Sequence, residues 1–316
     1  MSVSAETDRR IRSLRPAKTF IDPLKAHGSL IEQERRPSGY TERALTVFLA
    51  GAECPFACSF CDLWRWTIDG PTPPGALTKQ LEDVVSVLDD PVPERIKIYN
   101  ASNFFDRRAV PPEDWADIAR LVRPFTAVTV ESHASTIGPD VLEFARLVDG
   151  RLEVAVGLET VHPFASSQIN KRLDIDRFDR AASFLIANGI DLRVFVLIGV
   201  PFVPVEESVE WTVRSVNHAA ARGASVVSII PVRGGNGELE RLQALGHFTP
   251  PNVAQLEQVA AECSAITASV VTVDLWDIDS VDGCADCKPA RIDRLSRFNL
   301  TGVEEERVPC TTCGIV

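Results

Sequence analysis

The sequence predicts an α/β fold in which a parallel sheet curls into a partial (β/α)6 barrel, followed by a small cysteine-rich C-terminal extension. Strand-like and helix-like segments alternate about six times, which indicates parallel strands joined by right-handed crossovers. Several strand-like segments are continuous apolar runs, such as 194–198, and such runs are typical of strands buried on both faces. Four cysteines clustered between 284 and 313 set the extension apart.

Six strands are expected in the barrel, and they are placed by apolar runs that end at polar or glycine-containing loops. Their ranges are 44–51, 95–99, 127–131, 152–158, 192–200 and 225–232. A seventh apolar run, 269–275, precedes the polar tail. In parallel barrels the loops that follow the strands build the active site, so we expect the functional residues in these loops.

The helices between the strands are predicted by apolar residues that recur with the period of an α-helix. Leu81, Val84, Val85 and Leu88 show the spacing i, i+3, i+4, i+7. The same pattern predicts helices around 115–122, 141–148, 178–185 and 205–222. Gly189 and Gly223 follow the last two, where glycine suits the C-terminal end of a helix.

Length and charge limit the possible functions. The 316 residues suffice for an N-terminal extension (1–43), the barrel (44–235) and a C-terminal extension (236–316). A net charge of −11 argues against a broad phosphate-binding surface, so direct binding of tRNA is possible but not favoured. The sequence has no apolar run of the length of a signal peptide or a membrane span, so we expect a cytoplasmic protein without a membrane partner.

Cys54, Cys58 and Cys61 directly follow the first predicted strand. Thiolates this close together on one loop can bind one face of a metal cluster. A cubane iron–sulfur cluster normally takes four cysteines, so three would leave one iron open to a ligand from outside the protein. An open metal position distinguishes a catalytic site from a structural one. The alternative interpretation is three unrelated buried thiols, since free cysteine is often buried.

A second cysteine group lies in the tail, where two Cys-x2-Cys pairs are separated by 22 residues: Cys284, Cys287, Cys310 and Cys313. Four thiolates can bind a structural zinc ion in a tetrahedron, or they can hold an auxiliary iron–sulfur cluster. The remaining cysteine, Cys263, lies on the apolar face of a predicted helix that begins near Pro251, and we expect it to be a packed core thiol.

The Cys-x3-Cys-x2-Cys spacing after the first strand, with Phe60 before the last cysteine, resembles the radical S-adenosylmethionine (SAM) superfamily. The resemblance covers roughly residues 40–235. It implies that the three cysteines hold a [4Fe–4S] cluster whose fourth iron binds the amino and carboxylate groups of SAM. One electron from the reduced cluster then cleaves SAM to methionine and a 5′-deoxyadenosyl radical, which abstracts a hydrogen atom from the substrate. The resemblance also implies an external one-electron reductant such as flavodoxin or ferredoxin, and it identifies no catalytic residue on the chain.

The same resemblance assigns SAM contacts to residues at or near the ends of the strands. The assigned positions are Phe60, Asn100, Ser102, Glu131, Ser132, Glu159 and Lys171. The lysine stands where the family often has a basic residue for the SAM carboxylate. The sequence departs from some relatives at Phe195, where those relatives carry a polar residue that meets the ribose.

Segments 97–102, 153–160 and 228–232 are most similar to the radical subunit of archaeosine synthase, a branch related to the catalytic subunit of Elongator. This implies a modified nucleoside or base as substrate, free or in tRNA. A small metabolite of a biosynthetic pathway is the alternative substrate, and the acidic chain favours it. A non-catalytic iron–sulfur or zinc protein, for electron transfer or binding, is an alternative from another class. A methyltransferase or methylthiotransferase would need a second cysteine group near the barrel mouth. The missing fourth cysteine and the barrel favour the radical enzyme.

Overall fold

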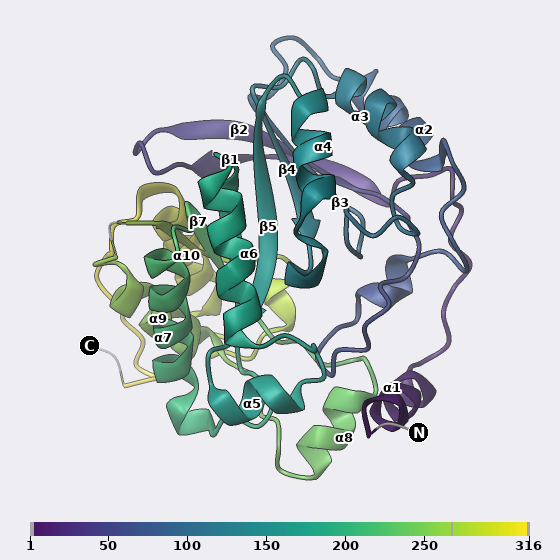
Figure 1. Ribbon diagram of the computed structural model, residues 1–316. Coiled ribbons are helices and arrows are strands. Elements are labelled where there is room, and N and C mark those ends of the chain that lie inside the picture. The colour runs from purple at the N-terminus through teal and green to yellow at the C-terminus, as the bar shows by residue number, and fades with distance from the viewer. Residues whose placement is uncertain (1–2, 267, 315–316) are drawn as a thin grey trace.

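The computed structural model describes residues 3–266 and 268–314, and within these residues one eight-stranded sheet forms the centre of the molecule (Figure 1). The strands are neighbours in the sheet in the same order as in the sequence, and only the first is antiparallel to its neighbour. Their bounds are β1 Gly28–Arg35, β2 Thr41–Phe48, β3 Arg95–Tyr99, β4 Ala127–Ser132, β5 Arg151–Glu159, β6 Asp191–Ile198, β7 Val226–Pro231 and β8 Val270–Val273.

The helices that connect the strands cover the outer face of the sheet, and the described ones are all too short or too polar to cross a bilayer (Figure 1). The described helices, including α1 before the first strand and α10 after the last, are α1 Val3–Leu14, α2 Ala76–Val85, α3 Trp115–Leu121, α4 Pro139–Leu147, α5 Pro163–Gln168, α6 Ile175–Ala187, α7 Ser208–Ala221, α8 Glu238–Ala244, α9 Val253–Cys263 and α10 Lys288–Thr301. Short 3-10 turns add η1 Leu63–Trp66, η2 Pro112–Asp114, η3 Ala134–Thr136, η4 Val205–Glu207 and η5 Ile278–Ser280.

The predicted fold class is confirmed, and the sheet is larger than the six predicted strands. The apolar run at 269–275 forms β8. The segment expected to be an N-terminal extension contains α1 and also contributes β1, which pairs with β2 along its whole length. Apolar periodicity does not reveal β1 because most of its residues are polar and exposed.

The outward-facing residues of the strands form the apolar core with the helices. Ile96 and Ile98 on β3 and Val194 on β6 are completely buried, and they pack in one cluster with Leu77 and Leu81 of α2. Because side chains alternate along a strand, the intervening residues face the inside of the curled sheet.

The inner face of the sheet at its amino-terminal half carries charged residues instead of the branched apolar residues that usually fill such barrels. Glu153 on β5 is the centre of the network: its carboxylate accepts hydrogen bonds from Arg193 on β6 and from Arg36, both at 2.9 Å. The other members are Glu32 and Glu34 on β1, Glu42 on β2, and Arg95 and Lys97 on β3.

These charges compensate one another because four acidic groups meet four basic groups. Burial alone would raise the pKa of the Glu34 carboxyl, but Arg193 and Lys97 reverse this effect and lower it to about 2. Burial likewise opposes ionisation of Glu153, and three arginines together hold its pKa well below its usual range. A buried network of this kind contributes little net stability when complete, but removing one partner exposes the full cost of an unpaired buried charge.

Replacing Arg193 by methionine should therefore lower the free energy of unfolding by about 3–5 kcal/mol, because Glu34 and Glu153 would stay buried without their main cation. Arg151→Met is the matched control: Arg151 starts β5, its side chain is 75% exposed, and it pairs with Asp191 at the surface. The control should change stability by about 0.5 kcal/mol or less. Chemical denaturation of both variants measures the difference, and equal losses would contradict the network's structural role.

Candidate functional site

The three cysteines of the first group lie on the loop between β2 and η1, at the carboxyl edge of the parallel strands, and each is half-buried. Three distant segments bind the backbone of this loop. Asn170 donates to the carbonyl of Ala57 at 2.7 Å, Asn236 donates to the carbonyl of Ser59 at 2.9 Å, and Arg12 of α1 donates to the carbonyl of Pro55 at 3.1 Å. The loop is therefore held in place by the protein itself.

The thiols in this loop are in an environment that keeps them protonated until a metal binds. Burial raises the pKa of Cys58 to about 12 and raises the pKa of Cys61 well above its usual range. Metal coordination supplies the positive charge that stabilises a buried thiolate. The Asn103 amide also donates to the sulfur of Cys54 at 3.3 Å, and hydrogen bonds of this kind tune iron–sulfur clusters.

The spacing of the three thiols fits a cluster better than a single ion. Among the described residues, only the tail cysteines bring metal-ligating atoms close enough together to bind one metal ion. Cys54, Cys58 and Cys61 do not form such a group. In a cubane each thiolate binds a different iron, so its ligands need not converge on one point. The donor set therefore fits an iron–sulfur cluster.

Polar groups without partners lie beside this loop. Asn100 follows β3 and is 1% exposed, and neither its side-chain oxygen nor its nitrogen has a hydrogen-bond partner in the structure. The hydroxyl of Ser102 is also buried and unpaired. A Cβ atom on Gly51, at the start of the cysteine loop, would lie 3.8 Å from the Asn100 nitrogen. Buried polar groups are almost always paired, so these atoms indicate a place for a polar ligand.

Glu131, at the end of β4, is surrounded by the backbone of the Asn100–Ser102 turn. The backbone N–H of Asn100 donates to the Glu131 carboxylate at 2.8 Å, and Ala101 adopts a left-handed backbone conformation with φ of 54°. Burial raises the pKa of Glu131 to about 7, although the backbone N–H groups of Asn100, Ala101 and Ser102 partly oppose this effect. The carboxyl group is thus close to half-ionised at neutral pH.

Glu159 and Lys171 form a buried ion pair of 2.5 Å at the end of β5. The sheet register shifts between Gly157 and Glu159, and Glu159 has φ of 67°, so a bulge turns this carboxylate toward the lysine. Gly157 leaves the necessary space, since a Cβ there would lie 2.6 Å from the lysine nitrogen. Burial disfavours the charge on Lys171, but Glu159 and the neighbouring Cys58 raise its pKa overall.

The remaining predicted SAM contacts are already engaged within the protein. The Ser132 hydroxyl lies 2.6 Å from that of Thr136. Phe60 is half-buried and packs with the apolar cluster that contains Ile169 and Leu197. Beside them lies His133, which is not one of the predicted SAM contacts. Its ring packs against that of Phe56 with ring centroids 4.2 Å apart, and burial lowers its pKa to about 3, so it is neutral.

Above the ionic network, the inner face of the sheet carries aromatic residues that remain partly exposed. Phe48 on β2, Tyr99 on β3 and Phe195 on β6 are half-buried, with ring centroids 6.4 Å apart for Phe48 and Tyr99 and 6.3 Å for Tyr99 and Phe195. Trp276, after β8, is 60% exposed, and its ring lies 5.4 Å from that of Phe48. The inner surface of the sheet is thus aromatic and reached by solvent.

Three residues near the site, Arg233, Trp276 and Asn103, are not among those that the cysteine motif and the family resemblance predicted. Arg233, after β7, donates to Asp274 at 3.2 Å and to the Trp276 carbonyl, and its Nε atom is buried without a partner. Arg233, Trp276 and Asn103 all follow strands of the parallel sheet, and this position is the signal that could have selected them.

The tail group is assembled as predicted. The ligand atoms of its four cysteines lie within 4.8 Å of one another. Cys263 is 1% exposed in α9, which confirms it as a packed core thiol.

No protein-family model matches the chain. The uncharacterized protein MJ0550 of Methanocaldococcus jannaschii is 25% identical over 218 residues, which is 65% of this chain and 60% of that protein. Archaeosine synthase subunit beta of Methanosarcina acetivorans is 24% identical over 279 residues, 84% of this chain and 80% of that protein.

Among solved structures, the Elp3 protein of Methanocaldococcus infernus with an N-terminal deletion superposes with a TM-score of 0.51 at 12% identity, covering 75% of this chain and 60% of that one. The chain has the fold of the radical SAM enzymes. Streptococcus suis SuiB bound to S-adenosylmethionine has a TM-score of 0.50 at 13% identity, covering 77% of this chain and 48% of that one. The chain therefore spans less than two thirds of MJ0550 and of both solved radical SAM structures.

Replacing Glu131 by glutamine should remove one pH-dependent contribution to stability. A carboxyl with a higher pKa in the folded chain binds more protons when folded, so its burial costs stability in full above about pH 7, less and less as the pH falls from 7 toward 4.5, and none well below 4.5. The glutamine variant should thus exceed wild type in free energy of unfolding by about 1–3 kcal/mol at pH 8, and this advantage should shrink as the pH falls below 7 and vanish near pH 4. Denaturation curves across this range test it, and a pH-independent difference would be inconsistent with the raised pKa.

Proposed function

We propose that the protein is a radical SAM enzyme that uses Cys54, Cys58 and Cys61 to hold a [4Fe–4S] cluster. When bound, the cluster and SAM supply the chemistry: one electron from an external donor such as flavodoxin or ferredoxin cleaves the C5′–S bond and yields methionine and a 5′-deoxyadenosyl radical, which takes a hydrogen atom from the substrate. The observation that carries this proposal is the completely buried, unpaired Asn100 amide next to a loop of three thiols that do not converge on one ion.

The chain's own residues then bind and orient SAM. Asn100 and Ser102 offer unpaired donors and acceptors for the methionine end of SAM. Lys171 provides a fixed cation for the SAM carboxylate, and Glu159 holds that cation in position at 2.5 Å. The Glu131 carboxylate fixes the Asn100–Ser102 turn by accepting hydrogen bonds from the backbone N–H groups of that turn.

Two further SAM contacts belong to the proposal on the strength of the family resemblance. Phe60 precedes Cys61, and Ser132 ends β4 beside Glu131, so both lie at the carboxyl edge of the sheet. Ser132 would have to exchange its contact with Thr136 for one with SAM, or hold SAM through a shared hydrogen bond.

We propose a modified nucleoside or base as the substrate, free or in tRNA. The likeness to archaeosine synthase subunit beta supports this class. The partly exposed aromatic rings of Phe48, Tyr99, Phe195 and Trp276 support it independently, because aromatic side chains bind planar bases by stacking. A small metabolite is the second candidate, favoured by the net charge of −11, which opposes close contact with a polyanion.

The reaction class is tested by anaerobic reconstitution with iron and sulfide, followed by dithionite and SAM. The wild-type protein should release 5′-deoxyadenosine, and Cys58→Ala should release none because it lacks one of three cluster ligands. Cys263→Ala is the matched control, since that cysteine is buried in α9, and it should retain activity. If wild type forms no 5′-deoxyadenosine while an established SAM-cleaving enzyme does so under the same conditions, the protein is a non-catalytic metal protein.

The substrate class is tested by tryptophan fluorescence with a deazaguanine nucleoside as the probe. The nucleoside should quench wild type because its ring stacks on Trp276, and Trp276→Ala should lose most of the quenching. Trp66→Ala is the control, because Trp66 is also half-exposed and its ring contacts that of His27, which is not part of the proposed stacking surface. Equal quenching in the two variants, or equal quenching by a non-aromatic amine such as lysine, would contradict stacking on Trp276.

A further inference from the structure

Two sulfur–sulfur separations among the four tail cysteines match those that a single tetrahedral ion imposes, and all four sulfurs lie within 4.8 Å of one another. The sulfurs of Cys284 and Cys310 lie 3.9 Å apart, and those of Cys287 and Cys313 lie 3.8 Å apart. Four sulfurs at 2.3 Å from one zinc ion are separated by about 3.8 Å in a regular tetrahedron. In an auxiliary cubane each thiolate would bind a different iron, which spreads the sulfurs much farther apart. We propose that this site binds one zinc ion that fixes α10 across the open seam of the sheet, which lies between the outer edges of β1 and β8.

The backbone around the site has the turns that such an ion requires. The amide of Lys288 donates to the carbonyl of Cys284 at 2.9 Å, so the first cysteine pair leads directly into α10. In the second pair, Gly314 has a left-handed φ of 67° and donates to the carbonyl of Thr311 at 3.1 Å. The Thr312 hydroxyl donates to Asp286 at 2.6 Å and joins the two turns.

The charge around the site also suits a zinc ion with four thiolates. Such a unit carries two net negative charges, so it needs a nearby cation or hydrogen-bond donor. Arg291 is 7% exposed, and its Nη1 atom lies 4.0 Å from the sulfur of Cys287. Glu257 on α9 accepts a hydrogen bond from Arg291 at 2.5 Å and holds the guanidinium beside the sulfurs.

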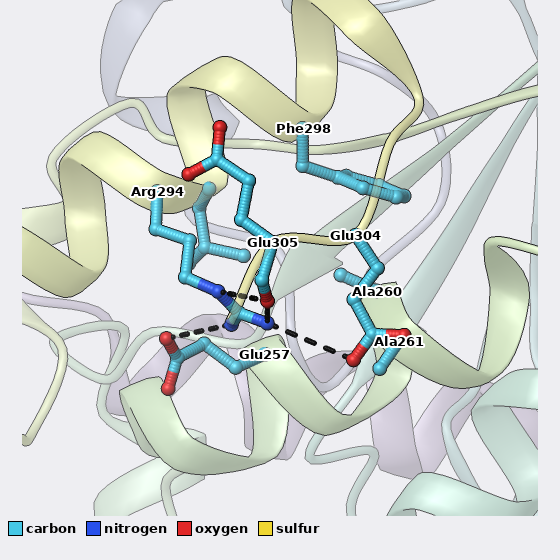
Figure 2. Close-up of a pocket in the computed structure, with 8 residues that line it drawn as sticks. Glu257, Ala260, Ala261, Arg294, Phe298, Glu304 and Glu305 are labelled. Carbon is cyan, nitrogen blue, oxygen red and sulfur yellow. Dashed lines mark hydrogen bonds and ion pairs between the residues drawn. The ribbon is translucent and has the colours of Figure 1, made fainter. Parts of the chain in front are cut away.

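The chain between the two cysteine pairs is packed against α9 and α10. Figure 2 shows Arg294 between Glu257 and the returning tail, where it donates to the Glu305 carbonyl. The Nε atom of Arg294 reaches the same carbonyl at 3.0 Å. The space enclosed there is about 10 Å³, barely enough for one water molecule. The tail is therefore already held at the position where its cysteines meet the first pair.

Helix α10 carries the contacts that bridge the two edges of the sheet. The sheet order ends at β1 on one side and β8 on the other, so their outer edges are not paired with each other. The Asn299 side chain accepts from the amide of Val273 at 2.8 Å and donates to its carbonyl at 2.7 Å, as a neighbouring strand would do. Arg35 of β1 donates to the carbonyls of Val271 at 3.3 Å and Asn299 at 3.4 Å. An ion at the start of α10 therefore stabilises the closure of the barrel.

Metal analysis of purified protein tests the identity of the ion. Cys58→Ala protein, reconstituted anaerobically with iron and sulfide, should contain about one zinc and almost no iron per chain, and a Cys58→Ala/Cys310→Ser variant should lose that zinc. Cys58→Ala/Cys263→Ala is the matched control and should keep it. About four irons per chain in Cys58→Ala would show an auxiliary cluster, one iron would show an iron site, and no metal would show free thiols; each result would overturn the proposal. This result is independent of whether the protein cleaves SAM.

Hydrogen exchange tests the structural role of the ion. Release of zinc from Cys58→Ala protein by a mercurial reagent, with the freed ion counted by an indicator dye, should increase exchange in α10 at least tenfold while β4 and β5 stay protected. Hydrogen exchange in the Cys58→Ala/Cys310→Ser variant should show the same increase in α10. Release of zinc by the mercurial reagent tests the proposal even if that variant fails to fold. Unchanged exchange in α10 after release of one zinc equivalent would show that the ion does not hold the seam.

Discussion

The buried ionic network inside the sheet is the constraint on which the rest of the structure depends. A curled parallel sheet must fill its interior, and here charged side chains fill the amino-terminal half. Strand β1 supplies both carboxylates that pair with Lys97, Glu32 and Glu34, and Glu34 joins Glu153 in pairing with Arg193. The arginine that follows β1, Arg36, adds to the pairing of Glu153. The antiparallel strand is therefore required by charge balance. Because the ionic network fills the amino-terminal half of the sheet interior, the carboxyl-terminal half, which lies beside the cysteine loop, is the part that can accept ligands.

The cysteine loop is positioned by segments from the whole length of the chain. Asp8 of α1 accepts a hydrogen bond from Asn170, and Asn170 also binds the loop carbonyl of Ala57. Asn236 donates to the loop carbonyls of Ser59 and Cys61. Contacts within the protein thus hold the backbone of this loop, as the support of a functional site requires. The N-terminal segment, which the composition presents as a charged extension, takes part in this support.

The sequence alone was enough to predict the strands buried on both faces, both cysteine groups and the carboxyl edge on which the first group lies. These features depend on local patterns: apolar runs, cysteine spacing and strand–loop order. It could not predict β1, whose eight residues are mostly exposed and whose role depends on ion pairs with β3 and β6. The cysteine motif did not select Arg233 and Trp276: their position after strands was a signal for them, but the contacts of their side chains with Asp274 and Phe48 form only in the folded chain. The family resemblance located Lys171, and the fold explains its charge by the proximity of Glu159.

The two cysteine groups show how the same side chain serves two kinds of site. The tail thiols converge within 4.8 Å, so one ion can use all four and no position is left for a substrate. The three loop thiols do not converge in this way, and they lie beside unpaired polar atoms of Asn100 and Ser102. A closed site suits the seam of the sheet, where a reactive metal would serve no purpose. An open site suits the carboxyl edge, which has an aromatic inner surface that could bind a substrate and a buried ion pair of Glu159 and Lys171 that could bind a carboxylate. The geometry of the sulfurs, more than their number, therefore distinguishes the group that suits one closed ion site from the group that suits a cluster with an open position.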